Sequence, residues 1–224
     1  LKDIRVEPHT WQGLDWNPDC KFAGKHGLIA AAPTMSRFND GTSKPFPMVE
    51  FFTLENREGR VGLKRYERES TPLLSSGART NINAITLASN GDVYASVIGI
   101  NPLNGGTPVA VNEAVCSPST ILDKNAVYLY KYEENKWIRV AKNIPAANGL
   151  YLAEDGKTLC VSSFSKGRVA YFSREPSTGL LSNYRSHSLG YFNSPDNLSP
   201  IDGTRASAMT TPGLLSGIAL GLGA

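Results

Sequence analysis

The sequence predicts an all-β fold, and three observations support this prediction. The 224 residues include 21 glycines and 14 prolines, so turn-forming residues recur at short intervals. Between the turns lie short runs that alternate between apolar and polar residues or are rich in β-branched and aromatic residues. No stretch of about 11 residues keeps the helical apolar period without a glycine or proline. Long helices are therefore not expected.

The clearest strands are short and are separated by turns. In chain order they are Met48–Leu54, Asp92–Ile98, Ala126–Tyr132 and Arg168–Ser173. Two segments rich in Gly, Pro, Ser and Asn, Phe38–Pro47 and Asn101–Pro118, are expected to be long loops.

A repeated segment distinguishes between the all-β architectures, because a propeller repeats its sequence whereas a sandwich or barrel does not. Residues 83–91 (NAITLASNG) align with residues 148–156 (NGLYLAEDG), and a second strand follows each of them. The residue pattern of each unit predicts a strand, an Asn-Gly or Asp-Gly hairpin turn and a second strand. The interval between the units corresponds to one blade of about 40 to 50 residues plus an insertion. Asn101–Pro118 is the natural insertion.

Weaker copies of this unit begin at Gly13 and Asn197, so the chain is interpreted as four to five four-stranded blades of a β-propeller. Residues 1–224 are expected to form one propeller domain that continues beyond either end, with 204–224 a tail or the remnant of a last blade. The apolar stretch Pro212–Ala224 is shorter than the roughly 20 residues that span a bilayer. We interpret it as a strand or packed tail, with a membrane-contacting helix as the alternative.

Three asparagines, Asn83, Asn148 and Asn197, begin the inner strands of their blades. Inner strands start beside the central channel of a propeller, so equivalent residues converge on its axis. Together with Asp196 these asparagines would form a ring of oxygen donors. Such a ring suits calcium, which takes roughly six to eight oxygen ligands, better than magnesium, which is smaller and requires a stricter coordination geometry. The alternative is that each asparagine only satisfies its own backbone in a turn.

Charge, cysteines and motifs exclude several other classes. Lys and Arg number 23 and Asp and Glu 20, which leaves a net charge of +3 without a basic run, so no nucleic-acid partner is expected. Three scattered cysteines do not make a disulfide framework, although one disulfide and a free thiol stay open. The motifs of serine hydrolases, nucleotide-binding proteins and zinc proteases are absent from the sequence.

Aromatic and basic residues have structural interpretations. The aromatic residues on predicted strands are expected to pack between blades; they are Trp11, Trp16, Trp137, Tyr128, Tyr130, Tyr132 and Tyr171. The mixed-charge segment Arg57–Glu69 is expected to be the solvated outer strand of a blade.

Three segments together resemble the paraoxonase/arylesterase family and, more distantly, the gluconolactonase-type propellers. They are Ala147–Ser163 with Gly167–Phe172, Ser194–Ser199, and Ile82–Ile85 around Asn83. The resemblance implies a six-bladed propeller with two axial calcium ions, of which the solvent-facing one binds the carbonyl oxygen of an ester or lactone. It also implies that Asn83, Asn148, Asp196 and Asn197 ligate that catalytic calcium.

The sequence departs from the family pattern at several positions. The family's acidic ligand would precede this chain, and Ala84 replaces an aspartate that serves the second, structural calcium. Gln12 and Ala32 stand where the family has histidines, and neither can act as a general base. His9 is therefore the candidate catalytic residue, with His26 as a further candidate. His187 is expected to be structural.

Two functions follow from these expectations. The first is a calcium-dependent hydrolase of small esters or lactones, in which the cation polarises the carbonyl while water attacks. The second is a catalytically inactive propeller that serves as a scaffold or as a subunit of a larger assembly. A partial propeller leaves blade edges unpaired, and a protein partner would cover them. By its resemblance the protein is expected to be secreted or associated with a membrane.

Overall fold

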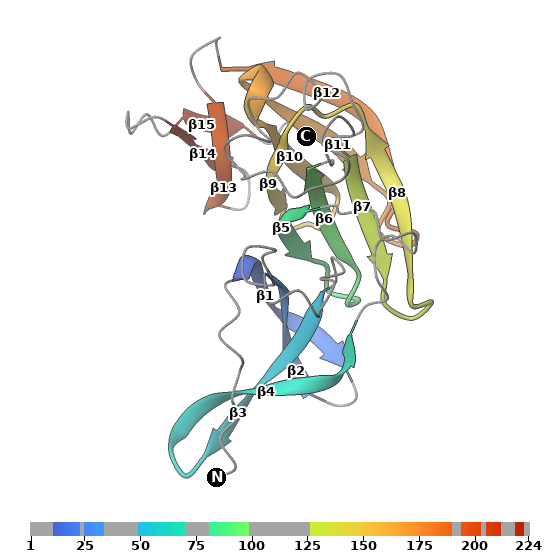
Figure 1. The fold of residues 1–224 in the computed structure, drawn as a ribbon, viewed down its shortest axis with the longest axis vertical. Coiled ribbons are helices and arrows are strands. Elements are labelled where there is room, and N and C mark those ends of the chain that lie inside the picture. The colour runs from blue at the N-terminus through green and yellow to red at the C-terminus, as the bar shows by residue number, and fades with distance from the viewer. Residues whose placement is uncertain are drawn as a thin grey trace, which may run out of the picture.

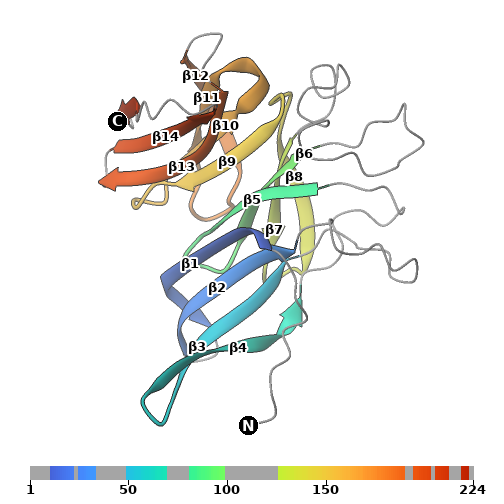
Figure 2. The same ribbon diagram turned by 60° about the vertical axis from the view of Figure 1, so that its left-hand side comes forward.

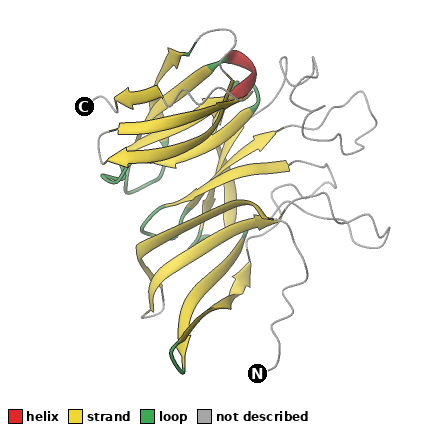
Figure 3. Cartoon of the chain, turned by 90° about the vertical axis from the view of Figure 1, so that its left-hand side faces the viewer, coloured by secondary structure: helices red, strands yellow, loops and turns green. Residues whose placement is uncertain are grey.

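The computed structural model describes residues 11–22, 25–33, 49–69, 81–98, 126–189, 194–202, 205–211 and 218–221. Strands dominate this part of the chain, and its one helix is the short 3₁₀ turn η3 (Phe164–Lys166; Figure 3). The prediction of an all-β fold without long helices is confirmed. The expected loops Phe38–Pro47 and Asn101–Pro118 lie outside the described residues. None of the described elements is a helix long and apolar enough to cross a membrane.

The strands form four antiparallel sheets in chain order (Figure 1). The first contains β1 (Trp11–Phe22), β2 (Lys25–Pro33), β3 (Glu50–Arg57) and β4 (Arg60–Glu69). The second contains β5 (Asn81–Leu87), β6 (Val93–Ile98), β7 (Ala126–Lys131) and β8 (Lys136–Lys142). The third contains β9 (Ala147–Leu152), β10 (Thr158–Ser163), β11 (Arg168–Arg174) and β12 (Leu181–Ser188). The fourth contains β13 (Ser194–Asp202), β14 (Arg205–Thr211) and β15 (Ile218–Gly221).

The four sheets are arranged as the blades of a propeller. The first strand of each sheet contacts the first strand of the next, from β1 to β5, from β5 to β9 and from β9 to β13. The last strands β4, β8 and β12 lie on the outside, and the sheets fan away from the inner strands (Figures 1 and 2). The predicted propeller of four-stranded blades is therefore confirmed, with four sheets in the described part of the chain.

The repeated sequence units adopt the same hairpin. In the β5–β6 turn, Gly91 has φ 84° and its N–H donates to the Ala88 carbonyl over 2.9 Å. In the β9–β10 turn, Gly156 has φ 66° and its N–H donates to the Ala153 carbonyl over 2.8 Å. Glycine adopts this left-handed backbone without steric cost, which is why both units place it there. The similarity of residues 83–91 and 148–156 therefore reflects two equivalent blades.

Each strand of the second sheet contributes to two cores, because alternate side chains point to opposite faces. Val93 and Tyr130 pack toward the first sheet, against Phe51. Their neighbours Tyr94 and Leu129 pack toward the third sheet. A further core joins the third and fourth sheets through Tyr151, Val169 and Leu198. The hydrophobic core therefore lies between the blades.

The expectation that all strand aromatics pack between blades is wrong for Trp16, whose side chain is 51% exposed. Gly13 and Asp15 face β5, so the alternation of β1 turns Leu14 and Trp16 to the opposite face. No sheet of the described chain covers that face. By contrast Tyr130 is fully buried and packs on Phe51 with ring centroids 6.0 Å apart.

A polar network links the second sheet to the hairpin between β11 and β12. The Tyr94 hydroxyl donates to the Gly179 carbonyl over 2.6 Å and accepts from Nε of Arg174 over 2.6 Å. Nearby, the Lys131 ammonium lies 2.7 Å from Oδ2 of Asp92. Burial raises the pKa of Tyr94 to about 12, so its hydroxyl remains a donor at neutral pH.

Replacing Tyr94 with phenylalanine removes this hydroxyl without changing the apolar packing of the ring. The Gly179 carbonyl and the Arg174 guanidinium would then each lose a partner, so we expect the free energy of unfolding to fall by about 1–3 kcal/mol. Tyr184→Phe is the matched control, because Tyr184 is 58% exposed, and it should change stability by less than about 0.5 kcal/mol. Urea denaturation of both variants tests this, and equal effects would contradict the role of the network.

The two cysteines of the described chain, Cys20 and Cys160, are free and buried. Desolvation raises the pKa of Cys20 to about 11 and that of Cys160 to about 12, so neither forms a thiolate at neutral pH. In a Cys116→Ser variant we expect no reaction with Ellman's reagent at pH 8 while the protein is folded, and two reactive thiols in urea. Labelling of either thiol in the folded protein would show that these environments are open to solvent.

Candidate functional site

The inner strands of the second and third sheets carry a β-bulge near their start. In β5 the register passes from Ile82 opposite Val97 to Ala84 opposite Ser96, so Asn83 is the extra residue. In β9 it passes from Ala147 opposite Ser163 to Leu150 opposite Val161, so Asn148 and Gly149 together oppose Ser162. Both predicted ligand asparagines of these sheets therefore lie in equivalent bulges.

The first and fourth sheets carry the same irregularity. In β13, Pro195 is opposite Thr210 and Leu198 is opposite Ala208, which puts Asp196 and Asn197 in the bulge. In β1, Trp11 is opposite Pro33 and Gly13 is opposite Ala32, which makes Gln12 the extra residue. Bulges redirect side chains and are frequent beside active sites. Their occurrence near the start of four adjacent inner strands marks this end of the sheets as the candidate site.

Asn83 and Asn148 are both buried, with 6% of each residue exposed. Ser96 and Ser162, on the second strands of the same sheets, are fully buried beside them. The Ser96 hydroxyl accepts from the Ala84 N–H over 2.9 Å and donates to the Ala84 carbonyl over 3.3 Å. This serine satisfies backbone groups that the bulge removes from the strand ladder, and thereby fixes the position of Asn83.

The other predicted site residues are placed less completely. The backbones of Asp196 and Asn197 occupy the β13 bulge, and their side chains are not among those described. His9 lies outside the described residues. His26 is opposite Lys21 beside the β1–β2 turn, at the far end of the first sheet from the Gln12 bulge. His187 lies on the outer strand β12 and is exposed.

Gln12 occupies the bulge of β1 as Asn83 and Asn148 occupy the bulges of β5 and β9. The sequence interpretation considers Gln12 only as the replacement of a histidine. The shared pattern Gln12-Gly13-Leu14 and Asn148-Gly149-Leu150 is the sequence signal of this equivalence. Ala32, the other replaced position, lies directly opposite Gly13. Gln12 and Ala32, the two positions that the resemblance aligns with histidines, therefore meet at one bulge.

The described side chains at these bulges, Asn83 and Asn148, offer amide oxygens. Within the described ranges no three His, Cys, Asp or Glu side chains come together as metal ligands. The thiols of Cys20 and Cys160 are held protonated by burial and are not nucleophiles. Amide oxygens such as those of Asn83 and Asn148 bind hard cations rather than zinc or other soft metals.

No protein-family model matches the sequence, and no curated protein matches it significantly. Among solved structures, a gluconolactonase from Xanthomonas campestris is 16% identical with a TM-score of 0.50. The alignment covers 82% of this chain and 52% of the gluconolactonase. Hydrazine synthase from Kuenenia stuttgartiensis is 14% identical with a TM-score of 0.50, and the alignment covers 87% of this chain and 54% of that protein. The Cps50 β-propeller domain from Myceliophteria thermophila is 14% identical with a TM-score of 0.48, and the alignment covers 91% of this chain and 53% of that domain.

These likenesses concern the fold. The chain spans about half the length of each of the three proteins. At identities of 14% to 16% a shared architecture carries no activity with it. The protein is a β-propeller, with gluconolactonase-type propellers among its structural neighbours.

Proposed function

We propose that this protein binds a calcium ion at the bulges of its inner strands and hydrolyses a small ester or lactone there. One observation carries the proposal: Asn83 and Asn148 are buried at equivalent bulges of adjacent sheets. An asparagine that only caps a turn does not require burial or a matched bulge in the next blade. Both features are expected of a ligand that adjacent blades direct to a common axis.

The residues present fit a hard cation. Amide oxygens are neutral ligands, so the burial of Asn83 and Asn148 brings no like-charge repulsion to the apo site. Asp196, at the equivalent bulge of β13, would supply negative charge. Asn197 is adjacent to it and would supply a further amide oxygen. Four oxygen-bearing side chains from three blades, with water completing the shell, make a set that calcium accepts more readily than magnesium.

In the proposed reaction, bound calcium supplies Lewis-acid polarisation of the substrate carbonyl. The contribution of the chain is positional. The bulges would direct the amide oxygens toward the axis, and Ser96 keeps the bulge around Asn83 in place through its two hydrogen bonds to Ala84. His9, three residues before Gln12, is the proposed proton acceptor, because Gln12 and Ala32 cannot take up a proton near neutral pH.

We expect purified protein to hydrolyse members of a panel of lactones and phenyl esters in calcium, and to lose this activity on chelation. The gluconolactonase that shares this fold makes lactones the first substrates to try. Asn148→Ala should lower kcat/KM by at least about tenfold, because it removes a ligand and not only a supporting contact. Asn56→Ala is the control, since Asn56 is exposed on β3, and it should leave kcat/KM unchanged. Undiminished turnover in chelator or by Asn148→Ala would exclude the proposed mechanism.

Gln12 and Ala32 favour a second candidate function, a propeller that binds the ion without catalysis and acts as a scaffold or subunit. Its inner and outer strand edges would then be covered by a protein partner or lie against a membrane. Calcium would still raise the melting temperature of the protein, because it binds the folded state alone. Absence of turnover together with a melting temperature that depends on calcium and on Asn148 would favour this function over the enzyme.

A further inference from the structure

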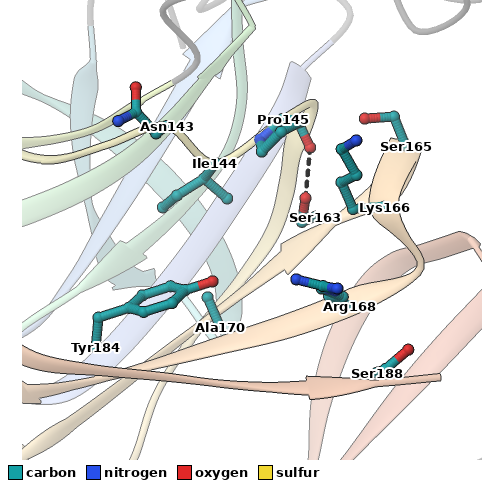
Figure 4. A pocket seen from close by; sticks show the side chains of 10 residues that line it. All are labelled: Asn143, Ile144, Pro145, Ser163, Ser165, Lys166, Arg168, Ala170, Tyr184 and Ser188. Atoms are coloured by element: carbon teal, nitrogen blue, oxygen red, sulfur yellow. Dashed lines mark hydrogen bonds between the residues drawn. The ribbon is translucent and has the colours of Figure 1, made fainter. Parts of the chain in front are cut away.

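A cavity of about 380 Å³ lies between the third sheet and the connector that leads into β9 (Figure 4). Its volume lies within the range of small-molecule sites. Three elements line it: the connector, the η3 turn with its flanking residues, and the outer strands of the third sheet. The lining residues are Asn143, Ile144, Pro145, Ser163, Ser165, Lys166, Arg168, Ala170, Tyr184 and Ser188.

The cavity is built on an ordered row of polar side chains across three strands. Arg168 on β11 is opposite Ser163 of β10 on one side and Ser188 of β12 on the other. Register partners share a face of the sheet, so Arg168 lies between two hydroxyl groups. The Ser163 hydroxyl donates to the Pro145 carbonyl over 2.7 Å and ties the connector to this row (Figure 4).

The charge of the cavity is positive. Lys166 and Arg168 are the ionised groups among its ten lining residues, and no aspartate or glutamate lines it. Neither basic side chain forms a salt bridge with another described residue. Gly167, with φ 55°, ends the η3 turn and lets the chain enter β11 directly, which brings the two basic residues to one wall. Their charge is therefore available to a bound anion.

Two further features indicate a ligand that also carries hydroxyl groups and carbon. The hydroxyl oxygen of Ser165 is buried and makes no hydrogen bond to any described residue, a state that normally costs free energy unless a partner is supplied. Tyr184 is 58% exposed at the cavity rim, where its ring packs against Phe172 at 5.4 Å between centroids. In Figure 4 the Tyr184 hydroxyl points into the cavity, above Ala170.

We propose that this cavity binds a small hydroxylated anion about the size of a phosphorylated sugar or a sugar acid. Arg168 would bind its phosphate or carboxylate oxygens in the bidentate manner that suits a guanidinium, and Lys166 would add a second positive charge. Ser165 and Ser188 would bond ligand hydroxyls, and Tyr184 would cover its carbon skeleton. None of the proposed calcium ligands lines this cavity, so the proposal does not rest on the calcium site.

Isothermal titration of the protein with glucose 6-phosphate, gluconate and glucose tests this proposal. We expect at least one of the two anions to bind and glucose to bind at least tenfold more weakly. Binding of glucose 6-phosphate alone would assign a phosphate ligand, and binding of gluconate alone a carboxylate. Absence of binding by both anions, or equal binding of glucose, would overturn the proposal.

Variants locate the binding. Arg168→Gln should weaken the affinity for the bound anion by about tenfold or more, and Arg168→Lys should have an intermediate affinity because it keeps the charge but not the planar fork. Lys136→Gln is the control. It also removes one positive charge, but Lys136 begins β8, whereas the cavity lies beyond the other end of this strand, so the affinity should change less than twofold. Both residues are exposed, so these variants are expected to fold. An unchanged affinity in Arg168→Gln, with the anion still bound, would place the site elsewhere and refute the assignment.

Discussion

The packing of the first two blades depends on how the unpaired edge of the inner strand β5 is satisfied. β5 begins its sheet, so part of its backbone has no ladder partner on the side that faces β1. The Asp15 carboxylate accepts from the Leu87 N–H over 2.7 Å and from the Thr86 hydroxyl over 3.0 Å. The Cys20 thiol donates to the Ala88 carbonyl over 3.0 Å. Burial raises the pKa of Asp15 above its usual value, and its hydrogen bonds to Leu87, Thr86 and Trp16 offset this only in part.

This edge contact determines how closely the inner strands approach. A Cβ atom on Gly13 would lie only 3.0 Å from the Ile85 backbone nitrogen, so the first two blades meet backbone to backbone. All four inner strands carry their bulges near their first residues. The bulges then turn those residues away from the ladder. We propose that the ligand positions depend on the packing of the blades, and that a calcium ion would be shared between blades because the blades are in contact.

The sequence predicted the features that depend on local chemistry. The hairpin glycines Gly91 and Gly156 and the alternating strands identified the blades, and the repeat identified Asn83 and Asn148 as equivalent. It could not predict the bulges, because a bulge is a difference in residue count between two paired strands. It could not predict the Asp15 contact with Leu87, which joins residues 72 positions apart. The basic cavity was also missed, since its lining comes from a connector and from the outer strands of the third sheet.

The measurement that tests the central claim most directly is a crystal structure of the protein grown in calcium. We expect an ion on the propeller axis with Oδ1 of Asn83 and Oδ1 of Asn148 among its ligands, at about 2.3–2.6 Å. Anomalous scattering would distinguish calcium from water or sodium at that position. If both amide oxygens instead bond only to protein groups, with no ion between the bulges in saturating calcium, the bulges are structural and the proposed site does not exist.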